Sequence, residues 1–283
     1  ETSAAIERWS AIEANHGGDE ESFEALLALL EQEQRWADLA QRIERQAEAT
    51  ADPIPRAALL VRLAELYANH TGQTEQALHA YAAADDWDGA MNAVRGVSDA
   101  EAGLAACREL YLTSVRYWKR SRDERVGEVT YWAVTEQRNR LLERGRHQDV
   151  VDLLLEAAEL DFATQTKRAM RQEAALLCQE RLAASERAAE IFSSLLEEDP
   201  ADEVAQASVP RLAILLDELG RSEAKVKVWE QQAACREAQE DRGGAAALWS
   251  RAASLAESEL KDIERALTDY RSGAALGGEE VAA

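Results

Sequence analysis

The sequence predicts an all-α protein, an α-helical solenoid of about seven antiparallel helix pairs. Three observations predict this class: the chain repeats itself at a fixed period, its composition favours helices, and turn-forming residues are sparse. The 283 residues are 46% hydrophobic and include only 4 Pro and 14 Gly. Alanine, leucine, glutamate and arginine dominate, and these are strong helix formers. Long alternating runs of Val, Ile and Thr are absent, so we expect almost no sheet.

Three segments share a small residue followed four positions later by an aromatic residue. They read LVRLAELYANHTGQTEQALHAYAAAD (60–85), RQEAALLCQERLAASERAAEIFSSLLEEDP (171–200) and WSRAASLAESELKDIERALTDYRSGA (249–274). The pairs are Ala77 and Tyr81, Ala188 and Phe192, and Ala266 and Tyr270. A fixed internal period marks a solenoid, in which each unit buries its apolar stripe against its neighbours.

A second form of the repeat lies between these segments and fixes the period. It reads QRWADLAQRIERQAE (34–48), GRHQDVVDLLLEAAE (145–159) and GRSEAKVKVWEQQAA (220–234), with Ala40, Val151 and Val226 at the position of the alanines above. The steps from 40 to 266 are then 37, 74, 37, 38 and 40 residues. The step of 74 covers two units, so the unit near Ser114 lacks the recognisable pattern. Each unit of about 38 residues holds two amphipathic helices.

The register resembles the tetratricopeptide repeat. In that family a small residue lies early in the second helix, an aromatic residue follows four later, a small residue three after that, and a proline closes the unit. Ala77, Tyr81 and Ala84 match this pattern, as do Phe192 and Pro200 in the later unit. Leu195 stands where alanine is usual, most units lack the first-helix tryptophan, and the units exceed the family's roughly 34 residues.

The resemblance covers nearly the whole chain and implies a right-handed superhelix. We therefore expect one elongated domain over 1–283, with N-terminal repeats in 1–85, an irregular unit in 86–125 and C-terminal repeats in 126–283. Ala5, Trp9 and Ile12 already match the second-helix pattern, and the final GGEEVAA resembles the start of GGDEESFEALLALL at Gly17. Both ends predict a fragment of a longer array.

The charge of the chain excludes some classes of partner. The formal net charge is −22 and the pI is near 4.6, so phosphate backbones and anionic membrane surfaces would repel it. No run approaches the 18 apolar residues of a membrane span, and the sequence contains no signal-peptide pattern, which a fragment could have lost. Cys107, Cys178 and Cys235 are an odd, scattered set that argues against a disulfide framework. We expect a cytoplasmic protein, and a bacterial one because only five of the 32 basic residues are lysines.

The segment 86–125 breaks the pattern. Its first helix, after Trp87, is expected to stop near Gly96, and Ser98 is the expected N-cap of the next helix, with Glu101 completing a capping box. An aromatic-rich island of positive charge follows in an otherwise acidic chain. We predict that it docks a protein partner, because Tyr, Trp and Arg are enriched at binding hot spots. The residues assigned to this basic island are Arg116, Tyr117, Lys119, Arg120, Arg122 and Arg125.

A structural interpretation of the island stays open. Tyr117, Trp118, Tyr131 and Trp132 would then be core residues at a helix crossing, and the arginines would pair with neighbouring glutamates. Helical spacing places Tyr111, Val115 and Trp118 on one face, so we expect Trp118 to be buried. Arg116, Tyr117 and Arg120 lie off that face and are the better candidates for exposure.

The groove of the solenoid is the second candidate site. In the tetratricopeptide family the first helices line this groove, and some members hold a C-terminal carboxylate there with Lys, Arg and Asn. The basic and amide residues on the first helices here are Arg56, Arg62, Asn69, Asn92, Arg138, Asn139, Lys167, Arg168 and Arg211. They do not align with that clamp, so the carboxylate function is not carried over.

Catalysis finds little support in the sequence. His16, His70 and His147 fall in expected turns, His79 lies on a helix face, and none has a second His or Cys at metal-ligand spacing. His70 and His79 could approach each other across a turn. No nucleophile elbow, phosphate loop or dinucleotide motif is present. We expect no enzyme, no cofactor and no metal.

The sequence therefore predicts a non-catalytic scaffold or adaptor that presents a curved repeat surface to a protein partner. One alternative is an effector of a bacterial switch protein, such as a Ras-like GTPase or a response regulator, whose binding would follow the partner's nucleotide or phosphorylation state. Another is self-assembly, with homo-association through apolar faces of the terminal repeats. An enzyme would require a closed helical ring with a carboxylate-lined cavity, and the units are too few for one.

Overall fold

The computed structural model describes residues 5–6, 8–9 and 20–277, and within these ranges the chain is all-helical, with no strand. This confirms the predicted fold class, an all-α solenoid with a tetratricopeptide-like pairing of helices. The chain forms two compact units, Glu1–Arg140 and Leu141–Ala283, and each is described by itself. The expected single domain over 1–283 stays a prediction. The expected repeat elements at Ile12 and in the final GGEEVAA lie outside the described residues.

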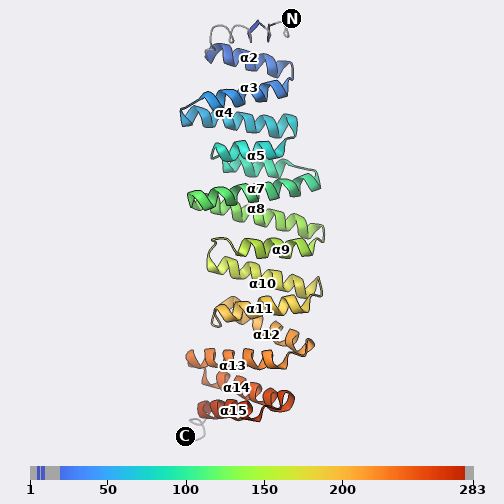
Figure 1. Cartoon of the computed structure of the whole chain (residues 1–283), viewed down its shortest axis with the longest axis vertical. Coiled ribbons are helices and arrows are strands. Elements are labelled where there is room, and N and C mark those ends of the chain that lie inside the picture. The colour runs from blue at the N-terminus through green and yellow to red at the C-terminus, as the bar shows by residue number, and fades with distance from the viewer. Residues whose placement is uncertain (1–4, 7, 10–19, 278–283) are drawn as a thin grey trace. The chain divides into compact units, whose positions relative to one another are not determined.

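The first unit stacks its helices in chain order, each packed against the next (Figure 1). They are α2 (Glu20–Gln32), α3 (Trp36–Ala49), α4 (Pro53–Leu66) with a π-helical extension η1 (Tyr67–Thr71), α5 (Thr74–Ala83), α6 (Trp87–Gly96), α7 (Ala100–Ser121) and α8 (Glu124–Glu143), whose residues from Leu141 on belong to the second unit. Helices α5 and α7 also contact each other, because α6 between them is short.

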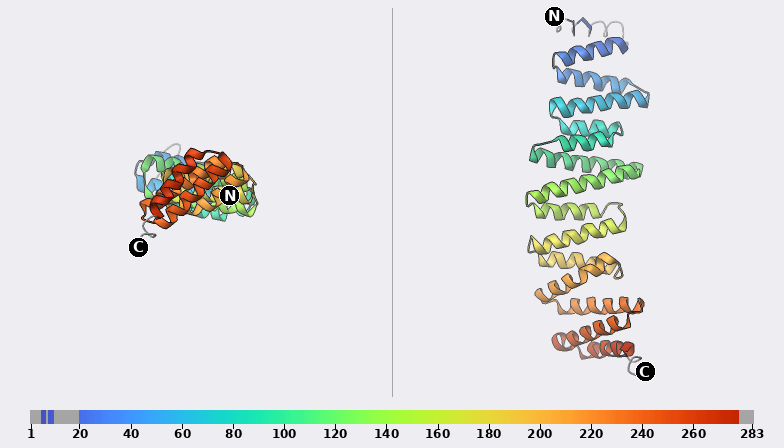
Figure 2. Two further views of the ribbon diagram at one scale, coloured as in Figure 1. Left: turned by 90° about the horizontal axis from the view of Figure 1, so that it is seen from below. Right: turned by 180° about the vertical axis from the view of Figure 1, so that it is seen from behind.

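The second unit is built in the same way, and Figure 2 shows its helices from behind. They are α9 (His147–Ala158), α10 (Thr164–Glu180), α11 (Ser185–Glu198), α12 (Glu203–Glu218), α13 (Ser222–Ala238), α14 (Arg242–Leu255) with its π-helical extension η2 (Ala256–Leu260), and α15 (Ile263–Gly277). None of the described helices in either unit is both long and apolar enough to cross a membrane.

The six predicted repeat positions all lie in the core. Each is at most 4% exposed and lies three or four residues into a second helix: Ala40, Ala77, Val151, Ala188, Val226 and Ala266. A small or branched side chain at this point allows the neighbouring helix to pack closely. The aromatic residues that follow are buried at Tyr81 and Phe192, whereas Tyr270 of α15 is 39% exposed.

The unit near Ser114 corrects the sequence analysis. Ser114 lies 37 residues after Ala77 and 37 before Val151, it is fully buried, and Trp118 follows it by four. The small-plus-aromatic pattern is therefore present. The helix boundaries are what differ, since α7 begins at Ala100, fourteen residues before Ser114. In the other units a loop precedes the small residue by three or four positions. Ser114 instead lies in the interior of a long helix, so the repeat was not recognised from the sequence.

In the segment 86–125 the predicted end of the first helix is confirmed, whereas the predicted N-cap of the next helix is wrong. Helix α6 ends at Gly96, as expected, but the N-cap of α7 is Asp99, whose carboxylate accepts a hydrogen bond from the Ala102 N–H at 2.8 Å. Ser98 was the wrong choice. Aspartate is as good an N-cap as serine. Because Asp99 follows Ser98, the helix begins one residue later than predicted, at Ala100.

Several turns inside the helix pairs contain one left-handed residue. Gly72, Gly145 and Gly220 fill this place before α5, α9 and α13, with φ between 64° and 66°. Glycine adopts this conformation without the steric cost that a Cβ brings. Gly145 and Gly220 begin the repeated Gly-Arg motif, so this motif indicates a left-handed residue in the turn before a second helix.

The cysteines are free thiols among the described residues, and Cys107 and Cys178 are fully buried. Burial raises the pKa of the Cys107 thiol to about 11, so it stays protonated at neutral pH. Cys178 is the small core hydrophobe that its repeat position predicts.

A glycine of α6 is required by packing. A Cβ on Gly89 would lie 2.5 Å from a ring carbon of Tyr81, whereas a Cβ on Gly96 in the same helix meets nothing within 4 Å. Gly89→Ala should therefore lower the free energy of unfolding by about 1–3 kcal/mol, because the ring has to shift out of its place. Gly96→Ala, the matched control, should leave stability unchanged or raise it by up to about 1 kcal/mol. Urea denaturation of both variants checks this, and equal stabilities would mean that Tyr81 does not pack on α6.

A buried carboxyl in the second unit makes its stability depend on pH. Asp269 of α15 is 3% exposed, its Oδ2 has no hydrogen-bond partner among the described residues, and Glu230 of α13 lies beside it. Burial, followed by the charge of Glu230, raises the pKa of Asp269 to about 6, although Arg265 opposes the shift. The unfolded chain loses this proton near pH 4, so the folded unit loses stability as pH rises from about 4 through about 6.

Asp269→Asn should remove that loss, because a neutral amide needs no proton in this place. We expect its melting temperature, relative to the natural chain, to be higher at pH 7.5 than at pH 4.5. Glu264→Gln removes an exposed carboxylate from the same helix and should show no such change between the two pH values. Parallel behaviour of the two variants would contradict the burial argument.

Candidate functional site

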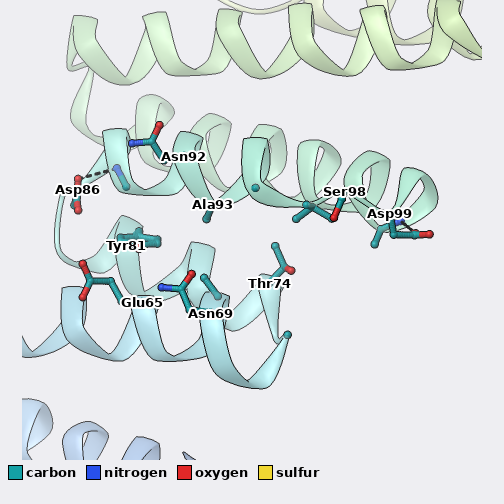
Figure 3. A pocket seen from close by; sticks show the side chains of 15 residues that line it. Glu65, Asn69, Thr74, Tyr81, Asp86, Asn92, Ala93, Ser98 and Asp99 are labelled. Atoms are coloured by element: carbon teal, nitrogen blue, oxygen red, sulfur yellow. Dashed lines mark hydrogen bonds between the residues drawn. The ribbon is translucent and has the colours of Figure 1, made fainter.

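A groove of about 630 Å³ lies in the first unit between two successive first helices, α4 and α6 (Figure 3). One wall is the end of α4 with η1, the other is α6 with the start of α7, and Tyr81 of α5 lies between them. Its lining residues are Glu65, Ala68, Asn69, Gly72, Thr74, Tyr81, Asp86, Gly89, Asn92, Ala93, Gly96, Val97, Ser98, Asp99 and Ala102. Many of these side chains are small, so a ligand can approach the helix backbones.

The repeat pattern itself builds the floor of the groove. Tyr81 is the aromatic residue four positions after Ala77, and it is only 7% exposed. Its ring lies against the backbone of Gly89, where a side chain would collide with it. The floor is thus a fixed aromatic surface, held by the packing that forms the helix pair.

The groove is acidic. Glu65 comes from α4, while Asp86 and Asp99 cap α6 and α7 by accepting hydrogen bonds from the N–H groups of Gly89 (2.9 Å) and Ala102 (2.8 Å). Burial raises the pKa of the Tyr81 hydroxyl, and the charges of Glu65 and Asp86 raise it further. No lysine or arginine is among the lining residues. A positively charged ligand therefore fits this field better than a negative one.

Two amides face the groove from opposite walls. Asn69 lies in the π-helical turn of η1, which ends at the left-handed Gly72, and Asn92 lies in α6. The Oδ1 of Asn92 accepts a hydrogen bond from Arg95 Nη1 at 2.9 Å, which leaves its amide hydrogens for other acceptors. An asparagine side chain offers both donors and acceptors, as a peptide bond requires.

The predicted groove cations are used elsewhere. Arg62 pairs with Glu24 at 3.0 Å, Arg211 pairs with Glu180 at 2.7 Å, and Arg168, 12% exposed, pairs with Asp202 at 2.6 Å. The first pair joins α4 to α2. The second joins α12 to α10, and the third joins α10 to the N-cap of α12. Of the basic and amide residues that the sequence analysis assigned to the first helices, two line the groove, and both are amides: Asn69 and Asn92.

All six residues of the basic island are exposed, but two are held by the fold. Arg116 donates from Nη2 to Thr113 Oγ1 (2.9 Å) and to Glu109 Oε1 (3.2 Å). Arg125 forms ion pairs with Asp85 and Asp123, both at 3.1 Å. For these two arginines the structure agrees with the alternative interpretation, in which the island cations pair with nearby acids.

The remaining island residues lie at the end of α7 and in the turn after it. Tyr117 is 38% exposed and meets Trp87 edge-on with ring centroids 5.4 Å apart. Arg122 adopts a left-handed conformation that ends α7. Lys119 and Arg120 are exposed, and neither pairs with a carboxylate within the described part of the chain. These two are the island cations most available to a partner.

The predicted burial of the α7 face holds in part. Tyr111 is fully buried, and Val115 and Trp118 are half-buried. Trp118 packs on Gly127 of α8, where a Cβ would lie 2.9 Å from the indole.

The histidines are separated. The His70 ring stacks on Trp36 with centroids 4.0 Å apart, while His79 Nε2 lies 2.8 Å from Glu109 Oε1, so each ring has its own neighbour. His147 is the first residue of α9, and His16 lies outside the described residues.

Sequence analysis missed most of the groove. The acids Asp86 and Asp99 look like ordinary helix caps, and Glu65 looks like an ordinary surface acid. The signal that could have found the site is the combination of Tyr81 with Gly89 eight residues later, since this pair predicts an aromatic floor under a bare helix backbone.

Comparison with known proteins finds three likenesses, all of them to solved structures. No family model and no curated protein matches the sequence. Among solved structures, the chain is similar to BtubC (BKLC) from P. vanneervenii, at 14% identity and a TM-score of 0.34 over 64% of this chain and 74% of that one. It is also similar to a tetratricopeptide repeat protein from Parabacteroides merdae, at 16% identity and a TM-score of 0.25 over 96% and 92% of the two chains.

A third likeness is to Naa15/Naa10 bound to HypK-THB, at 13% identity and a TM-score of 0.28 over 97% of this chain and 55% of that one. At these identities and TM-scores the likenesses carry no argument about function. The tetratricopeptide-like fold described above rests on the helix pairs of this chain.

Proposed function

We propose that this chain is a non-catalytic protein-interaction module that holds an extended, basic segment of a partner protein in the groove of its first unit. The observation that carries the proposal is the lining of the groove, in which three carboxylates and two amides surround an aromatic floor without a single basic side chain. A scaffold or adaptor role follows from such a surface.

The dimensions and chemistry of the groove support a peptide ligand. Its volume of about 630 Å³ lies in the usual range of roughly 300–1,000 Å³ for ligand sites. Amides on opposite walls can bond both edges of an extended backbone, and Glu65 and Asp99 can pair with lysine or arginine side chains. The net charge of −22 would also speed the encounter with a basic partner.

The lining also favours binding over catalysis. It includes hydroxyls, amides and carboxylates, but no histidine, cysteine or lysine. A histidine or lysine base and a cysteine nucleophile, which are common in covalent catalysis, are therefore missing from this lining.

The basic island is a second surface of the same module. Tyr117, Lys119 and Arg120 lie together at the end of α7, and their chemistry suits an acidic segment of a partner. Arg116, Arg122 and Arg125 complete the surface, with Arg116 and Arg125 held in place by Glu109 and Asp85. A switch protein of the Ras-like GTPase or response-regulator class could use either surface, and its binding would then depend on its nucleotide or phosphorylation state.

Fluorescence anisotropy with labelled peptide libraries tests the groove. One library carries Arg and Lys at fixed positions of an extended peptide, and the matched library carries Glu and Asp there. We expect the chain to select the basic library, and Asn69→Ala with Asn92→Ala to weaken that binding about tenfold or more, because two hydrogen bonds of roughly 1 kcal/mol each are lost.

The matched control is Lys119→Glu with Arg120→Glu, which alters the island and leaves the groove intact. It should keep the affinity for basic peptides and lose any affinity for the acidic library. Selection of the acidic library by the natural chain, or equal binding by the groove variant, would contradict the groove proposal.

Self-association is a second candidate function, favoured by one feature of α15. Ile263, Leu267 and Tyr270 recur at helical spacing and are 54%, 50% and 39% exposed, which forms an apolar stripe. Such a stripe suits the stacking of a further repeat, from another copy or another chain.

Light scattering across a hundredfold range of concentration tests self-association. If the stripe mediates it, the natural chain should gain mass as concentration rises, and Leu267→Glu should stay at the mass of one chain. Ile214→Glu replaces an exposed isoleucine of α12 and serves as the control. A constant mass for the natural chain would rule out this role for α15.

A further inference from the structure

Three metal-ligating side chains converge in the first unit, away from the groove lining. Glu75 and His79 lie four residues apart on α5, so they share one face of the helix. Glu109 projects from α7, which packs against α5. One ligand atom from each lies within 4.8 Å of the other two, and His79 Nε2 is 2.8 Å from Glu109 Oε1.

We propose that Glu75, His79 and Glu109 form a binding site for a divalent transition metal of the Zn²⁺ type. This is independent of the peptide groove. An imidazole nitrogen with two carboxylate oxygens suits Zn²⁺, Co²⁺ or Ni²⁺ better than Mg²⁺ or Ca²⁺, which prefer all-oxygen sites. Three protein ligands leave a fourth tetrahedral position for water. The two carboxylates balance the charge of the ion.

The burial of each of the three side chains suits its role as a ligand. The three ligand atoms lie within 4.8 Å of one another, and Glu75 and His79 are exposed, so these two side chains can adjust to the separation of about 3.3 Å between ligands of a tetrahedral zinc. Glu109 is half-buried and accepts hydrogen bonds from Thr113 Oγ1 (3.0 Å) and Arg116 Nη2 (3.2 Å). Such outer partners orient a ligating carboxylate.

Arg116 gives the site a property that a simple His79–Glu109 ion pair would lack. Its guanidinium bonds the same Glu109 oxygen that lies nearest to His79. A bound dication would repel this guanidinium, so metal binding and the present position of Arg116 oppose each other. The site would thereby link metal binding to the basic island, of which Arg116 is part.

This site could not be predicted from the sequence, because its ligands are one histidine and two glutamates rather than several histidines or cysteines. A search for second histidines or cysteines near each histidine finds none. Glu75 lies one turn before His79, and Glu109 follows thirty residues later on a helix of unusual length.

Calorimetric titration of the whole chain with Zn²⁺, without any added histidine tag and after removal of metal by a chelator, tests the proposal. Co²⁺ absorption in the visible range provides a second readout of an imidazole ligand. We expect one saturable equivalent. His79→Ala and Glu109→Gln should each weaken binding at least tenfold, while His70→Gln, which changes another exposed histidine of this unit, should leave it unchanged.

Two further variants separate a metal site from a structural pair. The Glu75 side chain is exposed and makes no hydrogen bond among the described residues, so Glu75→Gln removes a ligand without disturbing the fold, and it should also weaken binding. Arg116→Ala should tighten binding several-fold, because it removes the competing cation. No saturable binding below 100 µM Zn²⁺, or equal binding by the natural chain, Glu75→Gln and His79→Ala, would overturn the proposal.

Discussion

Close approach of neighbouring helices at one small, buried residue per repeat is the constraint on which this structure depends. The chain is composed of helices that cannot bury their apolar stripes alone, so each must pack on the next. A small side chain such as Ala77 or Ala188 allows that contact, and the aromatic residue four positions later fills the adjoining space. Where Tyr81 does so, it requires Gly89 on the next helix, and this contact also makes the floor of the groove.

The small-plus-aromatic spacing made the fold class predictable, because it depends on local periodicity that a single sequence displays. The unit at Ser114 escaped detection for a physical reason: its second helix lacks a turn before the small residue, so the pattern lies in the middle of α7. The exposure of Tyr270 could not be predicted either, because the same spacing buries Tyr81 and Phe192.

The candidate site was harder to predict than the fold, because it combines single residues of successive helices, and the sequence does not show which of them face one another. Arginines on first helices looked like groove residues, yet Arg62 and Arg168 pair with acids more than thirty residues away. Sequence shows the charge of each residue but not its partner. The amides Asn69 and Asn92 were named among the groove candidates, while the acids beside them were not.

The basic island also has a structural function that links it to the groove. The Trp87 indole donates a hydrogen bond to Asp85 (2.8 Å), Arg125 pairs with the same carboxylate, and Tyr117 packs edge-on against Trp87. These contacts fasten the start of α6, which is a wall of the groove. Island residues thus position the groove whether or not they meet a partner, and Lys119 and Arg120 remain the cleanest probes of docking.

Hydrogen–deuterium exchange of the chain with and without a bound basic peptide tests the central claim most directly, because it locates the ligand. The account predicts slowed exchange in η1, in α6 and at the start of α7, where Asn69, Asn92 and Asp99 lie. Protection confined to the end of α7 at Lys119 and Arg120, or no change in the first unit, would contradict it.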